Sequence, residues 1–159
     1  MRYTTKTEYG IICLIYLARH DEAGQVVPIK EIVSEEQYSL PFVEKIFQQL
    51  RGAGIVESHQ GFQGGFRLAR SPESITLKHI IDALEGTTYS IFCEPDIREG
   101  IVCTHLSKCG LNVIWHKSKE LLDEFYQSIN LKTLAESVNL PSAIELGVSA
   151  AKKRLNTSG

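Results

Sequence analysis

Three cysteines in the second half of the chain have the residue type and spacing of metal ligands. Cys93, Cys103 and Cys109 follow the pattern C-x9-C-x5-C, in a stretch that lacks the periodicity of a helix or a strand. Thiolates are soft ligands, and three of them in a short flexible segment can bind an iron–sulfur cluster or a zinc ion. The alternative interpretation is three unrelated free thiols. The spacing therefore favours a cysteine-containing metal-binding loop over residues 87–110.

The fourth cysteine lies in a helical pattern instead. Thr5 and Glu8 have the spacing of a capping box, which predicts that a helix begins there. Apolar residues then follow at helical spacing and form one face. That predicted face consists of Tyr9, Ile12, Cys13, Tyr16 and Leu17. We therefore expect Cys13 to be a small buried side chain.

Two further helices form a helix-turn-helix pattern. A short helix is predicted from Pro28, a residue favoured in the first turn, and the polar residues 34–38 predict a tight turn. The next helix has Ser39 as its N-cap candidate and Pro41 in its first turn, and Gly52 marks its end. Its apolar residues are Phe42, Val43, Ile46, Phe47 and Leu50.

A β-hairpin is predicted directly after this helix. Residues 55–58 and 66–69 read as short strands, and residues 59–65 between them are rich in glycine. These glycines lack the spacing of a phosphate-binding loop. A hairpin that follows a helix-turn-helix is a wing.

A long helix is predicted near the end of the chain. Thr76 first caps a helix over residues 77–85, and periodicity returns after the cysteine loop. Six residues then repeat at heptad spacing and define a seam: Leu111, Trp115, Ser118, Leu122, Phe125 and Ile129. We expect a second copy of the chain to cover this seam, and the alternative is one more core helix. Residues 131–159 carry weaker helical signals and end in the basic cluster Lys152-Lys153-Arg154, to which we assign no role.

Composition excludes several classes of protein. The 159 residues include 17 Lys and Arg against 19 Asp and Glu, so the net charge of −2 does not by itself indicate a nucleic-acid binder. A locally positive surface is nevertheless expected between Lys45 and Arg70, because Glu57 is the only acidic residue there. No apolar run has the roughly 20 residues of a membrane span, and the N-terminus has no signal region. We therefore expect a cytoplasmic chain without a disulfide framework.

The motifs taken together resemble the Rrf-two (Rrf2) family of bacterial winged-helix transcription regulators. That family includes an iron–sulfur cluster assembly regulator and a nitric-oxide-sensing repressor. The resemblance covers residues 1–130 and is carried jointly by its motifs. They are Met1-Arg2-Tyr3 with Tyr9-Gly10, residues 39–46, residues 50–56, residues 64–70, Ile75-Thr76-Leu77, Glu85-Gly86, the three loop cysteines and Trp115.

The resemblance implies a mainly helical fold with a small β-hairpin wing, and a homodimer that binds double-stranded DNA. Recognition helices of such dimers lie about 34–36 Å apart, so the operator is expected to be near-palindromic. The implied division of the chain is a winged helix-turn-helix DNA-binding domain over 1–86, the sensor loop over 87–110, a dimerisation helix over 111–130 and a C-terminal tail over 131–159.

The resemblance also identifies candidate DNA-binding residues. Glu44 could accept a hydrogen bond from a cytosine amino group and Gln48 could pair with adenine, whereas Lys45 and Arg51 are suited to the phosphate backbone. The alternative is a solvated helix face. Related regulators often have an arginine just before the first wing glycine, where this chain has Gln60. The candidates are Ser39, Pro41, Glu44, Lys45, Gln48, Arg51, His59 and Gln60, and we expect Arg67 and Arg70 to hold further phosphates.

For the cysteine loop, the resemblance favours an iron–sulfur cluster, either 4Fe–4S or 2Fe–2S, on Cys93, Cys103 and Cys109. The gap of nine residues is longer than in the relatives. The assembly regulator takes its fourth ligand from the position of Asn112, which is a poor iron ligand. The nitric-oxide sensor takes a carboxylate from the partner's first helix, where this chain has Glu8. The candidate ligands are thus the three cysteines and Glu8, with His105 and His116 as further candidates.

The sequence therefore predicts a homodimeric regulator whose operator binding depends on an iron–sulfur cluster. The expected signal is iron–sulfur status, nitric oxide or redox state. The alternative is a regulator of the same fold that senses by thiol oxidation or by binding a partner protein, without a metal. An enzyme is not expected, because no catalytic motif accompanies the cysteines.

Overall fold

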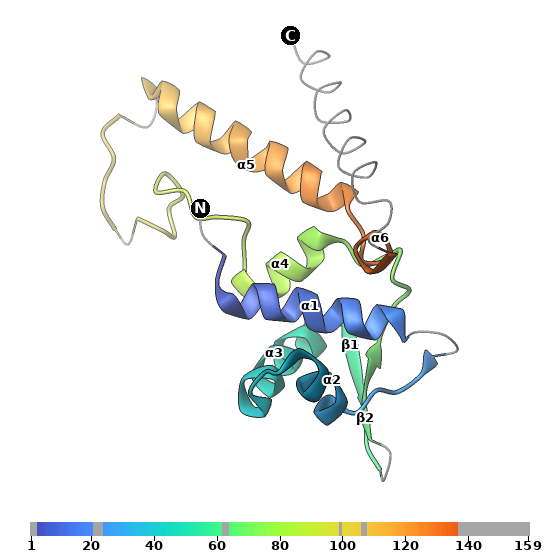
Figure 1. Cartoon of the computed structure of the whole chain (residues 1–159). Helices are drawn as coiled ribbons and strands as arrows, with labels where there is room; N and C mark the ends of the chain where they lie inside the picture. Colours follow the sequence, from blue (N-terminus) through green and yellow to red (C-terminus); the bar gives the residue numbers. More distant parts are fainter. Residues whose placement is uncertain (1–2, 21–23, 62–63, 99, 106–107, 137–159) are drawn as a thin grey trace.

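The computed structural model describes residues 3–20, 24–61, 64–98, 100–105 and 108–136. Met1, Arg2 and the basic cluster at 152–154 lie outside the described residues. In chain order, the elements are α1 (Thr5–Arg19), α2 (Ile29–Glu36), α3 (Leu40–Gly52), β1 (Val56–His59), β2 (Gly65–Leu68), α4 (Leu77–Glu85), α5 (Gly110–Ser128) and α6 (Leu131–Glu136). The predicted fold class, mainly helical with one small hairpin, is confirmed (Figure 1). Within the described ranges, no helix is long and apolar enough to cross a membrane.

The hydrophobic core lies between α1, α3, α4 and the hairpin. Phe47 and Leu50 on α3 are fully buried there, as the apolar pattern predicts. Cys13 is also fully buried, and burial raises the pKa of its thiol to about 12. The core is therefore assembled from helices of the predicted DNA-binding domain, and Cys13 is part of its packing.

The predicted start of α1 is wrong by one residue, and so is its capping. Thr4, not Thr5, is the N-cap, and its side chain makes no capping hydrogen bond within the helix. Glu85, at the end of α4, accepts hydrogen bonds from Thr4 and Thr7 in its place. A carboxylate from a distant helix thus does what the local pattern assigned to Glu8.

The buried face of α1 also differs from the apolar face that the sequence pattern predicts. The fully buried positions include two that hydropathy does not mark, Thr7 and Gly10, while Tyr9 and Tyr16 are only partly buried. The reason is the close approach of α4, because a Cβ atom on Gly10 would lie 2.5 Å from a Leu84 methyl carbon. Small residues therefore define this face.

The tight turn predicted within residues 34–38 lies at Gln37, between α2 and α3. Helix α2 continues through Glu36, and only Gln37 adopts the left-handed conformation, with φ 56°. Residues 34–36 are polar because this part of the helix faces solvent. Ser39 is the N-cap of α3 and Pro41 lies in its first turn, as predicted, although the Ser39 side chain makes no capping hydrogen bond.

The hairpin forms the predicted wing, each strand shifted by one residue. Strands β1 and β2 are antiparallel, with Val56 opposite Leu68 and His59 opposite Gly65. Val27 adds a bridge to Phe66 on the far side of β2. The segment before α2 is therefore attached to the wing.

The helices predicted over residues 77–85 and 111–130 are confirmed as α4 and α5, with ends that differ by at most two residues. Thr76 caps α4 in a reciprocal capping box with His79. The end of α5 is tied to the start of α4 by hydrogen bonds from Leu77 N to Ile129 O and from Leu131 N to Ile75 O, both 2.8 Å. The C-terminal end of the predicted seam is thus buried within the same chain, whereas its N-terminal end is exposed.

Candidate DNA-binding surface and cysteine loop

The candidate recognition surface is the solvent-facing side of α3. Val43, Ile46 and Phe47 hold the opposite side of this helix in the core. The predicted DNA-binding residues of α3 and its N-cap are all exposed: Ser39, Pro41, Glu44, Lys45, Gln48 and Arg51. Arg51 donates a weak hydrogen bond of 3.4 Å to Ser58 Oγ on β1. The structure therefore presents one continuous polar helix face next to the wing.

The wing carries the other two candidates. Gln60 is exposed after the end of β1, and His59 is partly buried. His59 Nε2 lies 3.4 Å from Glu57 Oε1, which also accepts a hydrogen bond from Arg67 Nε. Hydrogen bonds from Arg67 and His59 hold the pKa of the Glu57 carboxyl below its usual value. The Arg67 guanidinium is paired across the hairpin through its Nε atom, whereas Arg70 is exposed, and phosphate binding by either residue stays a prediction.

The three loop cysteines lie between α4 and α5. All are free thiols of intermediate exposure, and Cys109 is the N-cap of α5. Glu8 is exposed on the first turn of α1, and His105 and His116 are exposed as well. Among the described residues, no three histidine, cysteine or acidic side chains come close enough together to hold a metal ion. The structure thus places the cysteines in one loop but does not gather them into a ligand set.

The chemistry of this region still fits a bound cluster. Three thiols supply the soft ligands that iron–sulfur clusters require. Two buried polar atoms nearby, Arg98 Nε and Asn112 Oδ1, have no hydrogen-bond partner in the described part of the chain. Buried unpaired groups of this kind call for a partner that the described residues do not provide. The donors fit the group in kind, and a change in loop conformation would be needed to gather them.

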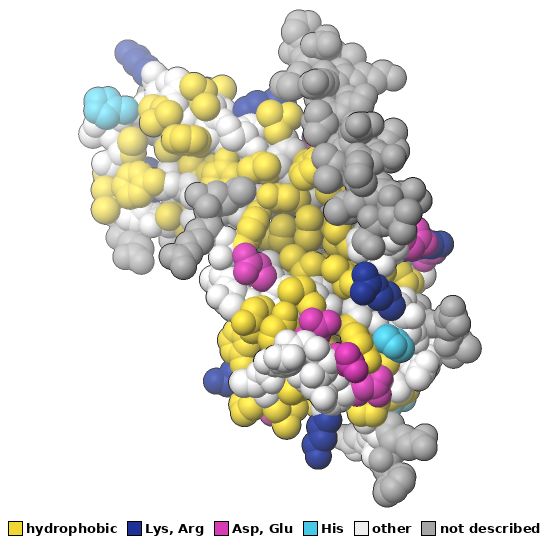
Figure 2. All heavy atoms as spheres, in the orientation of Figure 1, with side chains coloured by type: hydrophobic (Ala, Val, Ile, Leu, Met, Phe, Trp, Pro, Cys, Tyr) yellow, Lys and Arg dark blue, Asp and Glu magenta, His cyan; other side chains and the backbone are white. Residues whose placement is uncertain are grey.

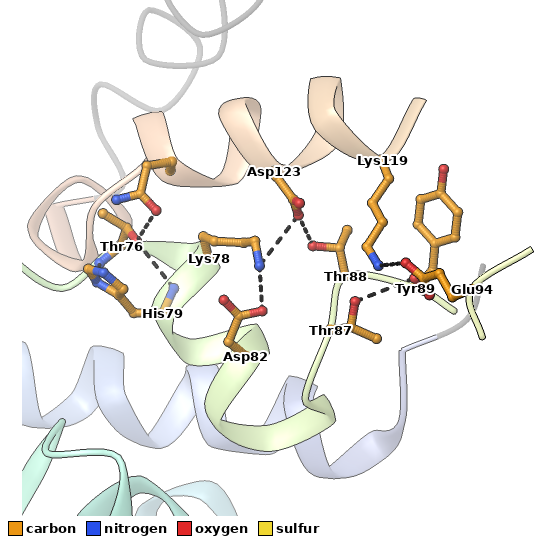
Figure 3. A network of polar contacts seen from close by, with 11 residues as sticks. Thr76, Lys78, His79, Asp82, Thr87, Thr88, Tyr89, Glu94, Lys119 and Asp123 are labelled. Carbon is orange, nitrogen blue, oxygen red and sulfur yellow. Dashed lines mark hydrogen bonds and ion pairs between the residues drawn. The ribbon is translucent and has the colours of Figure 1, made fainter. Parts of the chain in front are cut away.

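A polar network joins the loop to the helices on either side of it (Figure 3). On α5, Asp123 accepts a hydrogen bond from Thr88 in the loop and lies 3.4 Å from Lys78 Nζ on α4. One turn earlier, Lys119 Nζ lies 2.6 Å from Glu94 Oε1, directly after Cys93. The hydrogen bond from Lys119 lowers the pKa of the Glu94 carboxyl. The first part of the loop is therefore anchored along α5.

Sequence reasoning did not find this network or the Glu85 cap. Lys78 and Asp82 are four residues apart on one helix and form an ion pair, which their spacing could have suggested. The contacts that join separate elements involve Glu85, Asp123 and Lys119. No local pattern marks those residues, because their partners are far away in the sequence.

An apolar surface surrounds the cysteine loop and the first half of α5. Figure 2 shows hydrophobic side chains exposed in this upper part of the molecule. Val113, for example, is 67% exposed. The exposed large side chains are Phe92, Ile97, Ile101, Val102, Leu111, Val113, Ile114 and Trp115. Beside them, a cavity of about 530 Å³ is lined by Cys93, Trp115 and neighbouring residues.

Comparison with known proteins identifies the family. The Rrf2 family model, described as an iron-dependent transcriptional regulator, matches residues 3–137. The HTH-type transcriptional regulator IscR of Erwinia tasmaniensis is 31% identical over 139 residues, covering 87% of this chain and 79% of the relative. Among solved structures, CymR, the global cysteine regulator of B. subtilis, has a TM-score of 0.70 at 27% identity and covers 87% of this chain and 98% of that one. For T. potens IscR the TM-score is 0.65 at 29% identity, with coverage of 88% and 90%.

These relatives are transcription regulators and not enzymes. The predicted recognition helix α3 and the wing both lie within the residues that the family model matches, and the solved structure of CymR covers most of the chain. The chain belongs to the Rrf2 family of winged-helix, DNA-binding transcription regulators.

Proposed function

We propose that the chain acts as a homodimer on a near-palindromic operator, and that an iron–sulfur cluster bound by its loop cysteines controls this binding. The observation that carries the cluster proposal is the position of three free, partly exposed thiols in the loop between α4 and α5. In the proposed division of the chain, residues 1–86 bind DNA, residues 87–110 sense, residues 111–130 dimerise and residues 131–159 form a tail.

The exposed side of α3 supports the proposed reading of DNA. Glu44 and Gln48 are exposed one turn apart on this helix. A helix fits the major groove, where a carboxylate can accept a hydrogen bond from cytosine and an amide can pair with adenine. Lys45 and Arg51 would contact phosphates, Ser39 and Pro41 would approach the backbone at the start of the helix, and His59 and Gln60 would enter the adjacent minor groove.

The exposed apolar side chains of α5 support the proposed dimer. Val113 and Ile114 are more than half exposed in the first half of the helix, and Trp115 is 44% exposed. A contiguous apolar surface of this kind marks an interaction site in a soluble protein. A second copy of α5 crossing this half would bury it together with Leu111, at the start of the predicted seam.

Cys93, Cys103 and Cys109 would hold the cluster, with Glu8 of the partner subunit as the proposed fourth ligand. When bound, a cluster with one oxygen ligand supplies an iron that is open to nitric oxide, oxygen or a small thiol. The protein's own part is to connect the loop to DNA. Glu94 is tied to Lys119 on α5, Asp123 is tied to Lys78 on α4, and α4 packs directly against α3.

The test starts with protein purified without oxygen. We expect visible absorption, with iron and acid-labile sulfide in near-equal amounts. Cys103→Ser should lose both, whereas Cys13→Ala, which alters a buried core thiol, should keep them. Selection from a random duplex pool with loaded and stripped protein then gives the operator. Equal affinity of the two forms for the selected duplex would contradict control by the cluster.

A second candidate is control by thiol oxidation or by a partner protein, without a metal. The observation in its favour is that the described residues do not gather three ligands, while the loop thiols remain accessible. One of the solved relatives, CymR, is described as a global cysteine regulator. Colourless protein whose DNA affinity changes with hydrogen peroxide and recovers with dithiothreitol would support oxidation of the loop thiols. A partner would be indicated if neither treatment alters DNA binding.

A further inference from the structure

A groove separates the start of α2 from the loop at the tip of the wing, which joins β1 to β2. It has a volume of about 840 Å³ and is lined by Gln25, Pro28, Ile29 and Lys30 on one side and by Gly61 and Gly64 on the other. On the wing side, Gly61 leaves its backbone open to a close approach, because a Cβ atom there would meet nothing within 4 Å. The α2 side carries one charged group, the Lys30 ammonium.

The two walls of the groove are held at a fixed distance. Val27 and Phe66 exchange two backbone hydrogen bonds of 2.9 Å, which attach the segment before α2 to β2. Gly65 permits this contact, because a Cβ atom there would lie 2.2 Å from the Val27 carbonyl oxygen. Lys30 therefore has a defined position relative to the wing.

The charge of Lys30 is not compensated by the residues that the structure describes. Lys30 is exposed and has no ion pair or hydrogen bond within the described ranges. Glu31, its neighbour, accepts a hydrogen bond of 2.9 Å from the Tyr16 hydroxyl. Glu57, the acidic residue of the wing, is paired with Arg67. The acidic side chains next to Lys30 in the sequence and on the wing are thus already paired with other residues.

The position of the groove matches one part of a DNA duplex. Figure 1 shows α2 between α3 and the hairpin, and α2 packs against α3. In the proposed complex, α3 occupies the major groove and the wing enters the adjacent minor groove. Those two grooves of B-DNA are separated by one sugar–phosphate strand. That strand must cross the surface between α3 and the wing, and the groove opens next to this surface, between the start of α2 and the wing.

We propose that this groove between α2 and the wing seats a backbone phosphate of the operator, with Lys30 as its cationic partner. Such a contact positions the protein and carries no base information. It adds a contact that the candidates on α3 and the wing do not include. The inference rests on the proposed docking of α3 and the wing, so its test must separate the two.

The experiment measures affinity by fluorescence anisotropy as a function of salt, on the duplex selected with wild-type protein and on a scrambled duplex. Each phosphate contact contributes about 0.9 to the slope of log K against log salt. Lys30→Gln should therefore reduce the slope by about 1.8 per dimer, equally on both duplexes. Between 50 and 200 mM salt, the wild type should lose about 12-fold more affinity than the variant. Lys30→Arg should restore the slope.

Two controls separate the possible outcomes. Lys132→Gln removes the same charge from α6 and should leave the slope unchanged, and Lys45→Gln on α3 should reduce it. An unchanged slope in Lys30→Gln together with a reduced slope in Lys45→Gln would overturn this inference and leave the DNA-binding surface intact. Equal reductions in Lys30→Gln and Lys132→Gln would overturn it as well, since they indicate a general charge effect. Failure of the wild type to select any duplex would refute the proposed docking itself.

Discussion

Glu85 fixes the start of α1 from the end of α4, and its replacement should destabilise the protein in a pH-dependent way. Its Oε1 atom accepts three hydrogen bonds, from Thr4 N at 3.1 Å, from Thr4 Oγ1 at 2.5 Å and from Thr7 Oγ1. Thr7 is only 1% exposed, so its hydroxyl has no access to water as a substitute acceptor. The perturbations are Glu85→Ala, which removes the acceptor, and Glu85→Gln, which keeps an oxygen but removes the charge.

The magnitude follows from these contacts. A hydrogen bond to a charged group contributes about 1.5–3 kcal/mol to stability. Because the three bonds share one oxygen atom, their contributions are not additive, and we expect Glu85→Ala to lower the free energy of unfolding by about 3 kcal/mol. Glu85→Gln should cost about 1 kcal/mol. At this chain length 1 kcal/mol corresponds to about 2–4 °C in Tm, so the expected decreases are about 6–12 °C and 2–4 °C.

The pH dependence identifies the carboxylate as the cause. Burial raises the pKa of Glu85, but the hydrogen bonds from Thr4 and Thr7 outweigh burial and the net pKa is lowered. A lowered pKa means that the stabilisation is fully present above the pKa of the unfolded chain, about 4.3, and is lost as the pH falls through the folded value. The difference in stability between wild type and Glu85→Gln should be constant from pH 7 to about 5 and should shrink below about 4.

The assay is urea unfolding followed by circular dichroism at several pH values. Glu120→Gln is the matched control, because Glu120 is exposed and its pair with Lys117 lies on the surface, where such pairs contribute little. Thr7→Val, alone and combined with Glu85→Gln, completes a double-mutant cycle that isolates the coupling between the two side chains. The reasoning is refuted if Glu85→Gln matches Glu120→Gln at pH 7, or if its deficit is as large at pH 3 as at pH 7.

Two further predictions concern the wing and the loop. Gly65→Ala should weaken DNA binding at least tenfold and destabilise the protein, because a methyl group there collides with the backbone carbonyl of Val27. The control is Gly52→Ala, where a Cβ atom meets nothing within 4 Å, and this variant should bind DNA normally in the same anisotropy assay. Lys119→Ala should release the segment around Glu94, which is measured as faster amide exchange there, and Lys117→Ala should not. Unchanged exchange in Lys119→Ala would mean that this ion pair does not anchor the loop.

Most of the fold could be predicted because its signals are local. The cap at Thr76, the Gly86 that follows α4 and the proline in the first turn of α3 each depend on residues within one helical turn. The helical spacing of apolar residues on α3 likewise defines the side that packs in the core and the exposed side that is proposed to contact DNA. For these elements, the interactions that decide the structure are made between near neighbours in the sequence.

The remaining features depend on partners that no local pattern identifies. The Thr5 and Glu8 spacing predicted a capping box, but Glu85, 78 residues away from Thr7 in the sequence, accepts a hydrogen bond from Thr7 at the same helix end. The heptad seam predicted one uniform interface, but its C-terminal end is covered by α4 because the backbone of residues 129–131 pairs with that of residues 75–77. In both cases a long-range contact replaces the interaction that the sequence suggests.

The difference between local and long-range contacts also explains why the cysteine spacing could not specify a metal site. Cys93 is next to Glu94, which is held by Lys119, and Cys109 is the N-cap of α5, so both outer thiols are attached to the same helix. Cys103 lies between them, beside Val102, whose side chain is 82% exposed. Spacing in the sequence limits how far apart three thiols can be, but it does not determine whether the middle one turns toward the others. If a cluster binds, we expect the segment around Cys103 to move most, because the ends of the loop are already anchored along α5.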